Sequence, residues 1–242
     1  MIDFHSHILP RIDDGSKSVE LSLDMLQACK GQNIETIVAT PHFYRELEPI
    51  DSFLARRDAA FRELKQAYPE GINYPDIILA AEVSFFDGIS RDKDTEKLCI
   101  GNNRCLLLEM PFEKWNRHII QELRSLLLTD NVTIIIAHVE RYLAYENEKR
   151  DLYNLINMGA ILQIDSSFIN NRKSRKKAFS LLRIGDYFVL GSDCHNMSDR
   201  SPDLMDAREI ITTKLGERRL NQIDALSNFL LTDEQNSLRS IQ

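Results

Sequence analysis

The chain alternates short apolar runs with longer, helix-length segments, and this alternation limits the folds open to it. Most of the runs are continuously apolar and rich in β-branched residues, as in parallel strands buried on both faces. Seven strands are expected: Ile2–His5, Ile34–Thr40, Ile77–Val83, Arg104–Met110, Val132–His138, Ala160–Asp165 and Tyr187–Ser192. The expected helices are Lys17–Gln32, Asp51–Tyr68, Asn116–Leu128, Tyr142–Met158, Arg172–Ile184, Asp203–Leu215 and Gly216–Leu231. This order predicts a parallel α/β protein.

Seven strands in this rhythm favour a (β/α) barrel, and a doubly wound open sheet is the alternative. No GxGxxG follows the first strand, so the sequence does not support a dinucleotide site. A length of 242 residues suits one such domain, and residues 1–242 are expected to form it. The polar end, Thr232–Gln242, is expected to be a frayed final helix.

Charge and cysteine usage narrow the function classes. A net charge of −7 argues against nucleic-acid binding, which needs a basic face. The N-terminus MIDFHSHILP does not read as a signal peptide, and the longest apolar runs are too short to insert in a membrane. The four cysteines include no CxxC pair, so neither a zinc ribbon nor a disulfide framework is indicated. We expect a reduced, cytoplasmic protein.

Metal-type side chains gather at the ends of the expected strands. In parallel barrels the loops after the strands converge at one face, where active sites are built. His5 and His7 are two residues apart, which places both imidazoles on one side of an extended chain. The other strand-end residues of this kind are His42, Glu82, Glu109, His138, Asp193 and His195, and Asp13 and Asp14 follow in the first loop. His118 begins a helix and is expected at the surface.

A single strand-end histidine is usually a hydrogen-bonded structural residue. Glu82, however, lies inside the apolar run IILAAEV, where a carboxylate is costly unless it is paired or bound to a metal. Six strand ends that all carry ligand-type residues favour a metal site over independent structural roles. Nitrogen and oxygen ligands without thiolate suit Mn, Fe or Zn, and a bridging carboxylate suits more than one ion.

Taken together, the strand-end motifs (HxH at His5, PH at His42, the strand glutamates Glu82 and Glu109, AH at His138 and DxH at Asp193) resemble the PHP (polymerase and histidinol phosphatase) superfamily. More narrowly, they resemble the bacterial tyrosine phosphatases that regulate capsule and exopolysaccharide synthesis. The similarity runs from Met1 to about Leu215, in the segments MIDFHSHILPRIDDGSKS, VATPHF, LLLEMPF, IIAHVERY and GSDCHNMSDRSP. The resemblance implies a distorted seven-stranded barrel of the PHP type.

The resemblance also implies two or three divalent ions, with Mn favoured and Fe or Zn as alternatives. One ion would take His5, His7, Glu82 and Asp193; a second Glu82, Glu109 and His138; a third Asp14, His42 and His195. Arg141 and Arg200 match arginines that bind the substrate phosphate in this family. A planar guanidinium suits two phosphate oxygens, although either arginine could instead form a surface ion pair.

The expected activity is hydrolysis of a phosphomonoester by a hydroxide that the ions generate. The expected partner is a phosphotyrosine protein, with a bacterial tyrosine kinase as a possible example, and no oligomeric state is specified. Phe43 and Tyr44 are candidates for contacting the substrate ring. Histidinol phosphatase or another small-molecule phosphatase with the same metal site, and a non-catalytic regulatory domain, remain alternatives. Cys194 and Arg200 also satisfy the C-x5-R pattern of cysteine-dependent phosphatases, but the residues between them include no glycine for an anion-binding loop.

Overall fold

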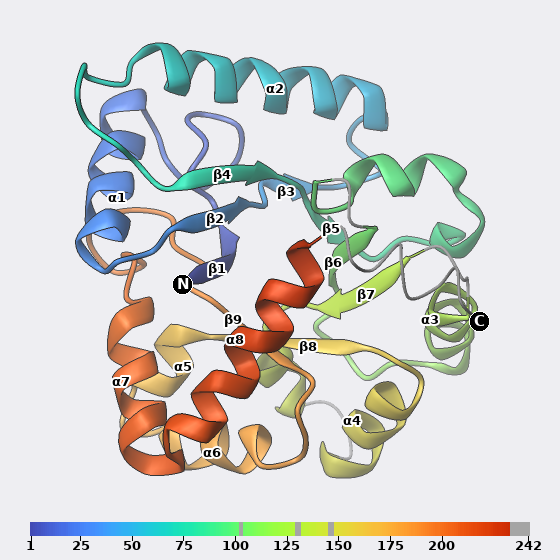
Figure 1. Cartoon of the computed structure of the whole chain (residues 1–242). Coiled ribbons are helices and arrows are strands. Elements are labelled where there is room, and N and C mark those ends of the chain that lie inside the picture. The colour runs from blue at the N-terminus through green and yellow to red at the C-terminus, as the bar shows by residue number, and fades with distance from the viewer. Residues whose placement is uncertain (102–103, 129–131, 145–147, 233–242) are drawn as a thin grey trace.

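The structure, a computed structural model, describes residues 1–101, 104–128, 132–144 and 148–232. Within these residues the strands are β1 (Ile2–Ser6), β2 (Thr36–Ala39), β3 (His42–Phe43), β4 (Asp76–Leu79), β5 (Glu82–Ser84), β6 (Cys105–Glu109), β7 (Thr133–Ile136), β8 (Ile161–Asp165) and β9 (Phe188–Gly191). The α-helices are α1 (Val19–Gly31), α2 (Ile50–Gln66), α3 (Arg117–Leu127), α4 (Glu148–Asn157), α5 (Ser166–Asn170), α6 (Arg175–Leu182), α7 (Leu204–Leu215) and α8 (Glu217–Leu231). The 3-10 helices are η1 (Ile89–Arg91), η2 (Lys93–Leu98) and η3 (Val139–Ala144). Figure 1 shows the strands at the centre with helices around them.

The strands form two parallel sheets, which confirms the predicted parallel α/β class. The smaller sheet has the order β1-β2-β4, and the larger has the order β3-β5-β6-β7-β8-β9. The strand count differs from the prediction. The expected strand Ile77–Val83 is divided into β4 and β5, and β3 is an additional two-residue strand beyond the expected strand that ends at Thr40.

Pro41 lies at the break between β2 and β3. Proline has no N–H and cannot donate to a strand ladder, so regular pairing stops there. Its carbonyl still accepts from the Glu82 N–H at 3.1 Å, and the Ala39 carbonyl accepts from the Ala80 N–H at 2.9 Å. Hydrogen bonding therefore continues across the break, although the strands on either side belong to different sheets.

The two sheets also meet where β1 runs beside the segment that follows β9. Ser6 and Cys194 form an isolated parallel bridge. The Asp193 N–H donates to the His5 carbonyl at 2.8 Å, and the His7 N–H donates to the Cys194 carbonyl at 2.9 Å. This pairing brings the first strand of the chain next to its last strand.

Apolar side chains divide into two buried clusters. The larger cluster includes apolar side chains of both the strands and the helices. The smaller one collects side chains from six strands and neighbouring segments, with Leu230 of α8: Phe4, Val38, Ala80, Ile100, Cys105, Leu107, Ile135, Ala137, Ile161 and Val189. Two positions further along the same faces, the residues become polar, as at Glu82, Glu109 and Gln163. On this face, β6 and β8 thus pass from an apolar start toward a polar end, and Glu82 follows Ala80 in the same way.

The predicted helices are present with boundaries shifted by a few residues. Ser18 and Asn116 cap α1 and α3 by accepting from backbone N–H groups three residues later, which supports the starts of both helices. The expected helix Tyr142–Met158 becomes η3 and α4, and residues 145–147 lie outside the described part. α5 was not predicted. Of the expected tail helix, residues 233–242 also lie outside the described part.

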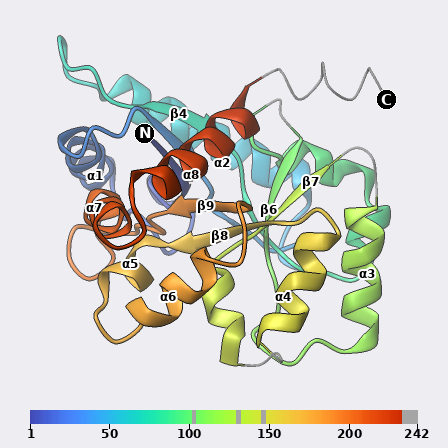
Figure 2. The ribbon, with the colours of Figure 1, turned by 60° about the horizontal axis from the view of Figure 1, so that its bottom comes forward.

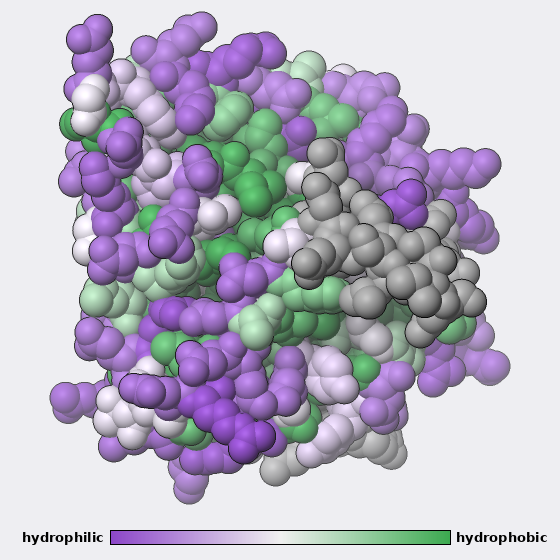
Figure 3. Space-filling view, in the orientation of Figure 1, coloured by the Kyte–Doolittle hydropathy of each residue, from purple (hydrophilic) through white to green (hydrophobic). Residues whose placement is uncertain are grey.

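The helix α8 packs against β9 and β1, on the side where the strands begin (Figure 2). Figure 3 shows polar residues at the margins of this face and an apolar area over β4. Ile77, Ile78 and Leu79 of β4 are half-buried there. Among the described residues, no helix has the length and apolar character needed to cross a membrane.

Candidate metal centre

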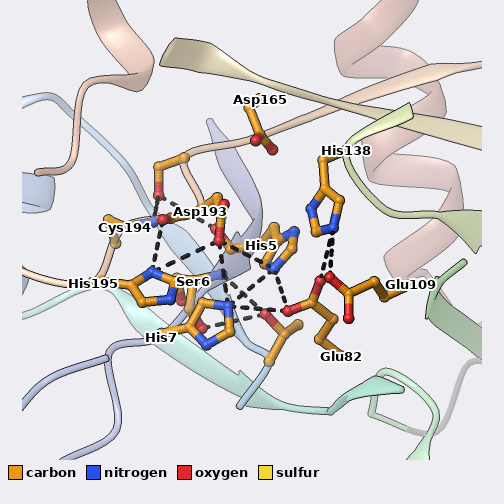
Figure 4. Close-up of polar contacts among 12 residues, drawn as sticks. His5, Ser6, His7, Glu82, Glu109, His138, Asp165, Asp193, Cys194 and His195 are labelled. Carbon is orange, nitrogen blue, oxygen red and sulfur yellow. Dashed lines mark hydrogen bonds and ion pairs between the residues drawn. The ribbon is translucent and has the colours of Figure 1, made fainter. Parts of the chain in front are cut away.

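All nine residues predicted as metal ligands lie together in one cluster, on the strands or in the segments next to them. Figure 4 shows imidazoles and carboxylates from different strands pointing toward one another. The groups whose ligand atoms all lie within 4.8 Å include His7, Asp14, His42 and His195; His5, Glu82 and His138; His5, His7 and Asp193; and His42, Glu82 and Glu109. Parallel strands bring their ends to one edge, so residues far apart in sequence share one site.

The carboxylate of Glu82, at the start of β5, is at the centre of the cluster and fully buried. Its Oε2 lies 3.2 Å from His5 Nε2, 3.3 Å from His7 Nε2 and 2.9 Å from His42 Nδ1. Its Oε1 lies 3.2 Å from His138 Nε2. Within the described part of the chain, neither oxygen accepts a hydrogen bond of good geometry. A buried carboxylate surrounded by imidazole nitrogens without such bonds fits a cation between them.

The pair His5 and His7 supplies the clearest test of this fit. Their Nε2 atoms face each other at 3.1 Å, and they lie 3.5 Å and 3.4 Å from Asp193 Oδ1. Two nitrogens bound to one ion at about 2.0–2.1 Å from it lie roughly 3 Å apart. The separations therefore suit two lone pairs directed at one ion. Oxygen and nitrogen donors of this kind fit Mn, Fe or Zn equally well.

Two further groups of ligand-type residues flank His5 and His7. On one side, His138 Nε2 lies 3.1 Å from Glu109 Oε1. On the more exposed side, Asp14 Oδ1 lies 3.4 Å from His42 Nε2 and 3.3 Å from His195 Nε2. The side chain of Asp14 is 61% exposed, so this third set opens toward solvent.

The backbone around the site is in unusual conformations. His138 and Asp193 have φ angles of 28° and 52°, which non-glycine residues rarely adopt. Gly15 allows the first loop to pack against β1, because a Cβ there would lie 2.3 Å from the His7 carbonyl oxygen. Strained residues persist where surrounding bonds hold them, and they often gather at functional sites.

Burial and neighbouring charges strongly shift the pKa values of the histidines in this cluster. Burial opposes protonation of His5, but Glu82 and Asp193 prevail and raise its pKa to about 9. Burial likewise opposes protonation of His7, while its bond to Asp13 raises its pKa well above the ordinary value. Burial and the charge on His7 lower the pKa of His195 to about 4. Metal binding would displace the protons from His5 and His7.

The two arginines predicted to bind phosphate lie at the edge of this cluster. Arg141 Nη2 is 2.5 Å from Asp193 Oδ2, and Arg200 Nη2 is 2.6 Å from the same oxygen. Asp165 Oδ2 also accepts from Arg141 at 3.1 Å. Asp193 therefore faces the imidazoles with one oxygen and the guanidinium groups with the other.

The loop after β9 holds Arg200 in place. The His195 and Asn196 N–H groups donate to the Arg200 carbonyl at 2.8 Å and 3.2 Å. The Arg200 N–H donates in turn to the Asn196 side-chain oxygen at 3.2 Å. These bonds close the loop and return Arg200 to the site.

Sequence reasoning missed Gln163 and Asp165 of this site, and it named Asp13 without giving it a role. Asp13 Oδ2 accepts from His7 Nδ1 at 2.7 Å and from the His42 N–H at 3.0 Å. Asp165 belongs to a further possible ligand group with His138 and Asp193. Gln163 is fully buried beside His5. The signal for Asp165 and Gln163 was present, because both interrupt an otherwise apolar strand near its end.

The two predicted ring-contacting residues differ in the structure. Phe43 is fully buried against Phe53 in the apolar core, so it does not face the site. Tyr44 is partly exposed, and its ring centroid lies 5.5 Å from that of His42. Phe112, which was not predicted, is 44% exposed and stacks on His138 at 5.9 Å. His118 is exposed, as predicted, and pairs with Asp87.

Cys194 lies in a site unsuited to a nucleophile. Its side chain is fully buried, and burial together with the carboxylate of Asp3 raises the pKa of its thiol. Reactive cysteines are partly exposed and have lowered pKa values. The surroundings of Cys194 therefore disfavour the C-x5-R alternative.

The chain matches the family described as capsular polysaccharide synthesis, CpsB/CapC, over residues 1–228. The chain belongs to the CpsB/CapC family. This confirms the predicted resemblance to phosphatases of capsule and exopolysaccharide synthesis. The CpsB/CapC match covers nearly the whole chain, including every residue of the candidate metal centre.

Two relatives and one solved structure extend the CpsB/CapC assignment. The chain is 30% identical to tyrosine-protein phosphatase CpsB of Streptococcus pneumoniae, over 92% of this chain and 94% of that protein. It is 29% identical to tyrosine-protein phosphatase YwqE of Bacillus subtilis, over 97% and 92%. A solved structure from work on YwqE of Bacillus subtilis and CpsB of Streptococcus pneumoniae, described as metal-dependent tyrosine phosphatases, matches with a TM-score of 0.79 at 27% identity. That match covers 96% of this chain and 94% of the other.

Proposed function

We propose that this chain is a metal-dependent protein-tyrosine phosphatase. The convergence of nine ligand-type residues beside two arginines carries the proposal. A set of imidazoles and carboxylates suits divalent ions, and arginines next to it suit a phosphate group. The tyrosine phosphatases CpsB and YwqE support the same assignment through their similarity to the whole chain.

The two sheets are proposed to form a distorted seven-stranded barrel in a single domain of residues 1–242. Counting β2 with β3, and β4 with β5, as interrupted strands leaves seven. The bridge between Ser6 and Cys194 supports closure between the first and last strands. A barrel explains why the polar strand ends surround one site and the apolar starts surround a second core.

Three ions are proposed, with Mn favoured and Fe or Zn as alternatives. His5, His7, Glu82 and Asp193 would hold one; Glu82, Glu109 and His138 a second; Asp14, His42 and His195 a third. When bound, such ions lower the pKa of water toward neutrality and neutralise charge on phosphoryl oxygens. Glu82, which lies within 3.3 Å of four imidazole nitrogens, would be shared between sites.

Arg141 and Arg200 are proposed to bind the substrate phosphate. Each uses one Nη2 atom on Asp193 and is more than one-third exposed, so other N–H donors remain for a ligand. Two planar guanidinium groups at one edge can grip several phosphate oxygens. A phenolate leaves with a parent pKa of about 10, so a phosphotyrosine ester needs less proton donation than an alkyl ester does.

The proposed substrate is a phosphotyrosine protein, for which a bacterial tyrosine kinase is one candidate. A reduced, cytoplasmic location is part of the same proposal. The four cysteines are all buried and none of them forms a disulfide, which supports a reducing compartment.

The test is metal removal and replacement with a panel of substrates. Purified protein is stripped with chelator, analysed for elements, and assayed with Mn²⁺, Fe²⁺ or Zn²⁺ on matched phosphotyrosine and phosphoserine peptides and on histidinol phosphate. We expect activity to vanish with the metal, to return with it, and to favour phosphotyrosine. Glu82→Ala should abolish activity, while His118→Ala serves as a surface control. Full activity without bound metal, or a preference for histidinol phosphate, would overturn the proposal.

A further inference from the structure

Gln163 is a polar side chain inside an apolar strand. It lies in β8 between Leu162 and Ile164, which both pack in the larger apolar cluster, and it is fully buried on the opposite face. Burying an amide is costly unless its hydrogen-bonding groups are satisfied. The partners of this amide therefore explain why the strand carries it.

The side-chain oxygen of Gln163 accepts two hydrogen bonds. One comes from His5 Nδ1 at 3.1 Å and the other from the His138 backbone N–H at 2.7 Å. Because an amide oxygen only accepts, His5 must carry a proton on Nδ1, which leaves Nε2, the nitrogen that faces Glu82 and His7, as the one free to bind an ion. The second bond holds His138 in its strained backbone conformation.

The side-chain nitrogen of Gln163 reaches the phosphate side of the site. It donates to Asp165 Oδ1 at 2.9 Å, and Asp165 Oδ2 accepts from Arg141 at 3.1 Å. Reversing the amide would turn its NH₂ group toward the His138 N–H and its oxygen toward a carboxylate. The chemistry of the neighbours therefore fixes its orientation.

Gly191 on the adjacent strand β9 makes room for this amide. A Cβ at Gly191 would lie 2.7 Å from Gln163 Nε2 and 2.5 Å from His5 Cβ, and both distances are too short for real contacts. The glycine and the glutamine are thus matched across neighbouring strands.

We propose that Gln163 is a positioning residue that sets the geometry of metal binding and of phosphate binding together. It fixes the tautomer of His5 and the backbone of His138, and through Asp165 it orients Arg141. This role requires no contact of its own with an ion or with substrate. The proposal rests on the proposed function for the roles of these three residues.

Three substitutions separate the parts of this role. Gln163→Leu removes both hydrogen-bonding functions. Gln163→Glu keeps an acceptor for His5 and His138 but places a carboxylate against Asp165. Gln163→Asn keeps the amide on a shorter side chain that cannot reach both partners as before. Gln222→Leu, a half-exposed glutamine of α8, is the matched control.

The first measurement is metal affinity, obtained by titrating Mn²⁺ into chelator-stripped protein and by elemental analysis. Residues that orient metal ligands typically change affinity or activity by about ten- to a hundred-fold. We expect Gln163→Leu to lose affinity in that range and Gln222→Leu to match the native protein. Histidine nitrogen NMR of the stripped protein above pH 9, where His5 is neutral, should show its proton on Nδ1 in the native protein and shared between Nδ1 and Nε2 in Gln163→Leu.

The second measurement is steady-state kinetics on an aryl phosphate at saturating metal, which gives the changes in KM and in kcat separately. Gln163→Glu should raise KM several-fold, because the disturbed Asp165 no longer orients Arg141, while retaining more metal affinity than Gln163→Leu. A merely structural glutamine would instead lower thermal stability and leave metal affinity and KM unchanged, and this result would overturn the proposal. If Gln163→Leu does not fold, Gln163→Asn decides by the same two readouts. If the native protein lacks phosphatase activity, the affinity and NMR measurements still test Gln163 while the proposed function fails separately.

Discussion

Arg141, in η3, and Arg200, in the loop after β9, both donate to one oxygen atom of Asp193. This shared oxygen places both guanidinium groups on the same side of the cluster, while Asp193 Oδ1 stays 3.5 Å from His5 Nε2. An aspartate that serves both groups can couple the position of the metal ligands to the position of the phosphate. The segments after β7 and β9 thus contribute phosphate-binding candidates to the site as well as ligand-type residues.

Either Arg141→Ala or Arg200→Ala should weaken catalysis without removing the metals. Charge-assisted hydrogen bonds contribute about 1.5–3 kcal/mol each, so losses of about ten- to a hundred-fold in kcat/KM are expected. The measurement is steady-state kinetics on a phosphotyrosine peptide, together with elemental analysis of each variant. Arg124→Ala, at an exposed position of α3, is the control. Native kinetics in both variants would mean that phosphate binds elsewhere.

Cys194→Ser should keep a substantial part of the activity. The thiol is buried and its pKa is raised, so it is not available as a thiolate at neutral pH. His5→Ala and Asp193→Ala should lose most of the activity under the same assay. A phosphocysteine trapped on Cys194 would contradict the metal mechanism.

At the scale of elements, the change from apolar to polar residues along one face of a strand, seen in β6 and β8, explains how one fold holds both a core and a site. In β6, Cys105 and Leu107 belong to the smaller apolar cluster, and Glu109 on the same face belongs to the cluster of ligand-type residues. The period of two was readable from the sequence. The additional strand β3 after Pro41 and the break at Ala80 were not predicted, because they depend on which strand lies alongside.

The loop after β6 displays an aromatic ring at the rim of the site. Its ends are held by the Met110 N–H, which donates to the Tyr142 hydroxyl at 2.9 Å, and by Trp115 Nε1, which donates to the Pro111 carbonyl at 3.1 Å. Phe112 stacks on Tyr142 with ring centroids 5.6 Å apart, yet stays 44% exposed. A rigid loop with an exposed ring beside His138 suits contact with an aryl group.

Phe112→Ala should therefore impair aryl phosphates more than alkyl phosphates. Aromatic pairs contribute about 0.5–1.5 kcal/mol, so kcat/KM for a phosphotyrosine peptide should fall about two- to ten-fold. Activity on phosphoserine peptides should change little. Tyr187→Ala, an exposed aromatic at the opposite end of β9, is the control. Equal losses on both substrates would assign Phe112 to loop packing instead.

At the scale of the whole molecule, metal binding and protonation compete for the same imidazoles. His5 has a folded pKa of about 9 in the metal-free protein, above its ordinary value of 6.5. Its contribution to metal-free stability is therefore complete below about pH 6.5 and is lost as pH rises through 9. Metal binding requires the neutral imidazole, so its affinity should rise over the same range.

Binding of Mn²⁺ at pH 7 should accordingly release protons. The measurement is calorimetry in two buffers with different ionisation enthalpies, combined with thermal unfolding of stripped and metal-loaded protein from pH 6 to 9. Stabilisation by the metal should grow with pH. Metal binding that is independent of pH and releases no proton would show that His5 and His7 are not the ligands.

The sequence by itself predicted the parallel α/β class, most helix positions and eight ligand-type residues at the strand ends, while the choice of Asp14 as the ninth came from the family resemblance. These follow from local periodicity and from the rule that parallel strands end at one face. Only the tertiary structure decided that Phe43 packs in the core while Phe112 faces the site. It also decided that Gln163 joins His5, 158 residues away in sequence, to His138 and Asp165. Such links depend on which strands are neighbours and on where each side chain finds a hydrogen-bond partner, and neither is encoded in a local pattern.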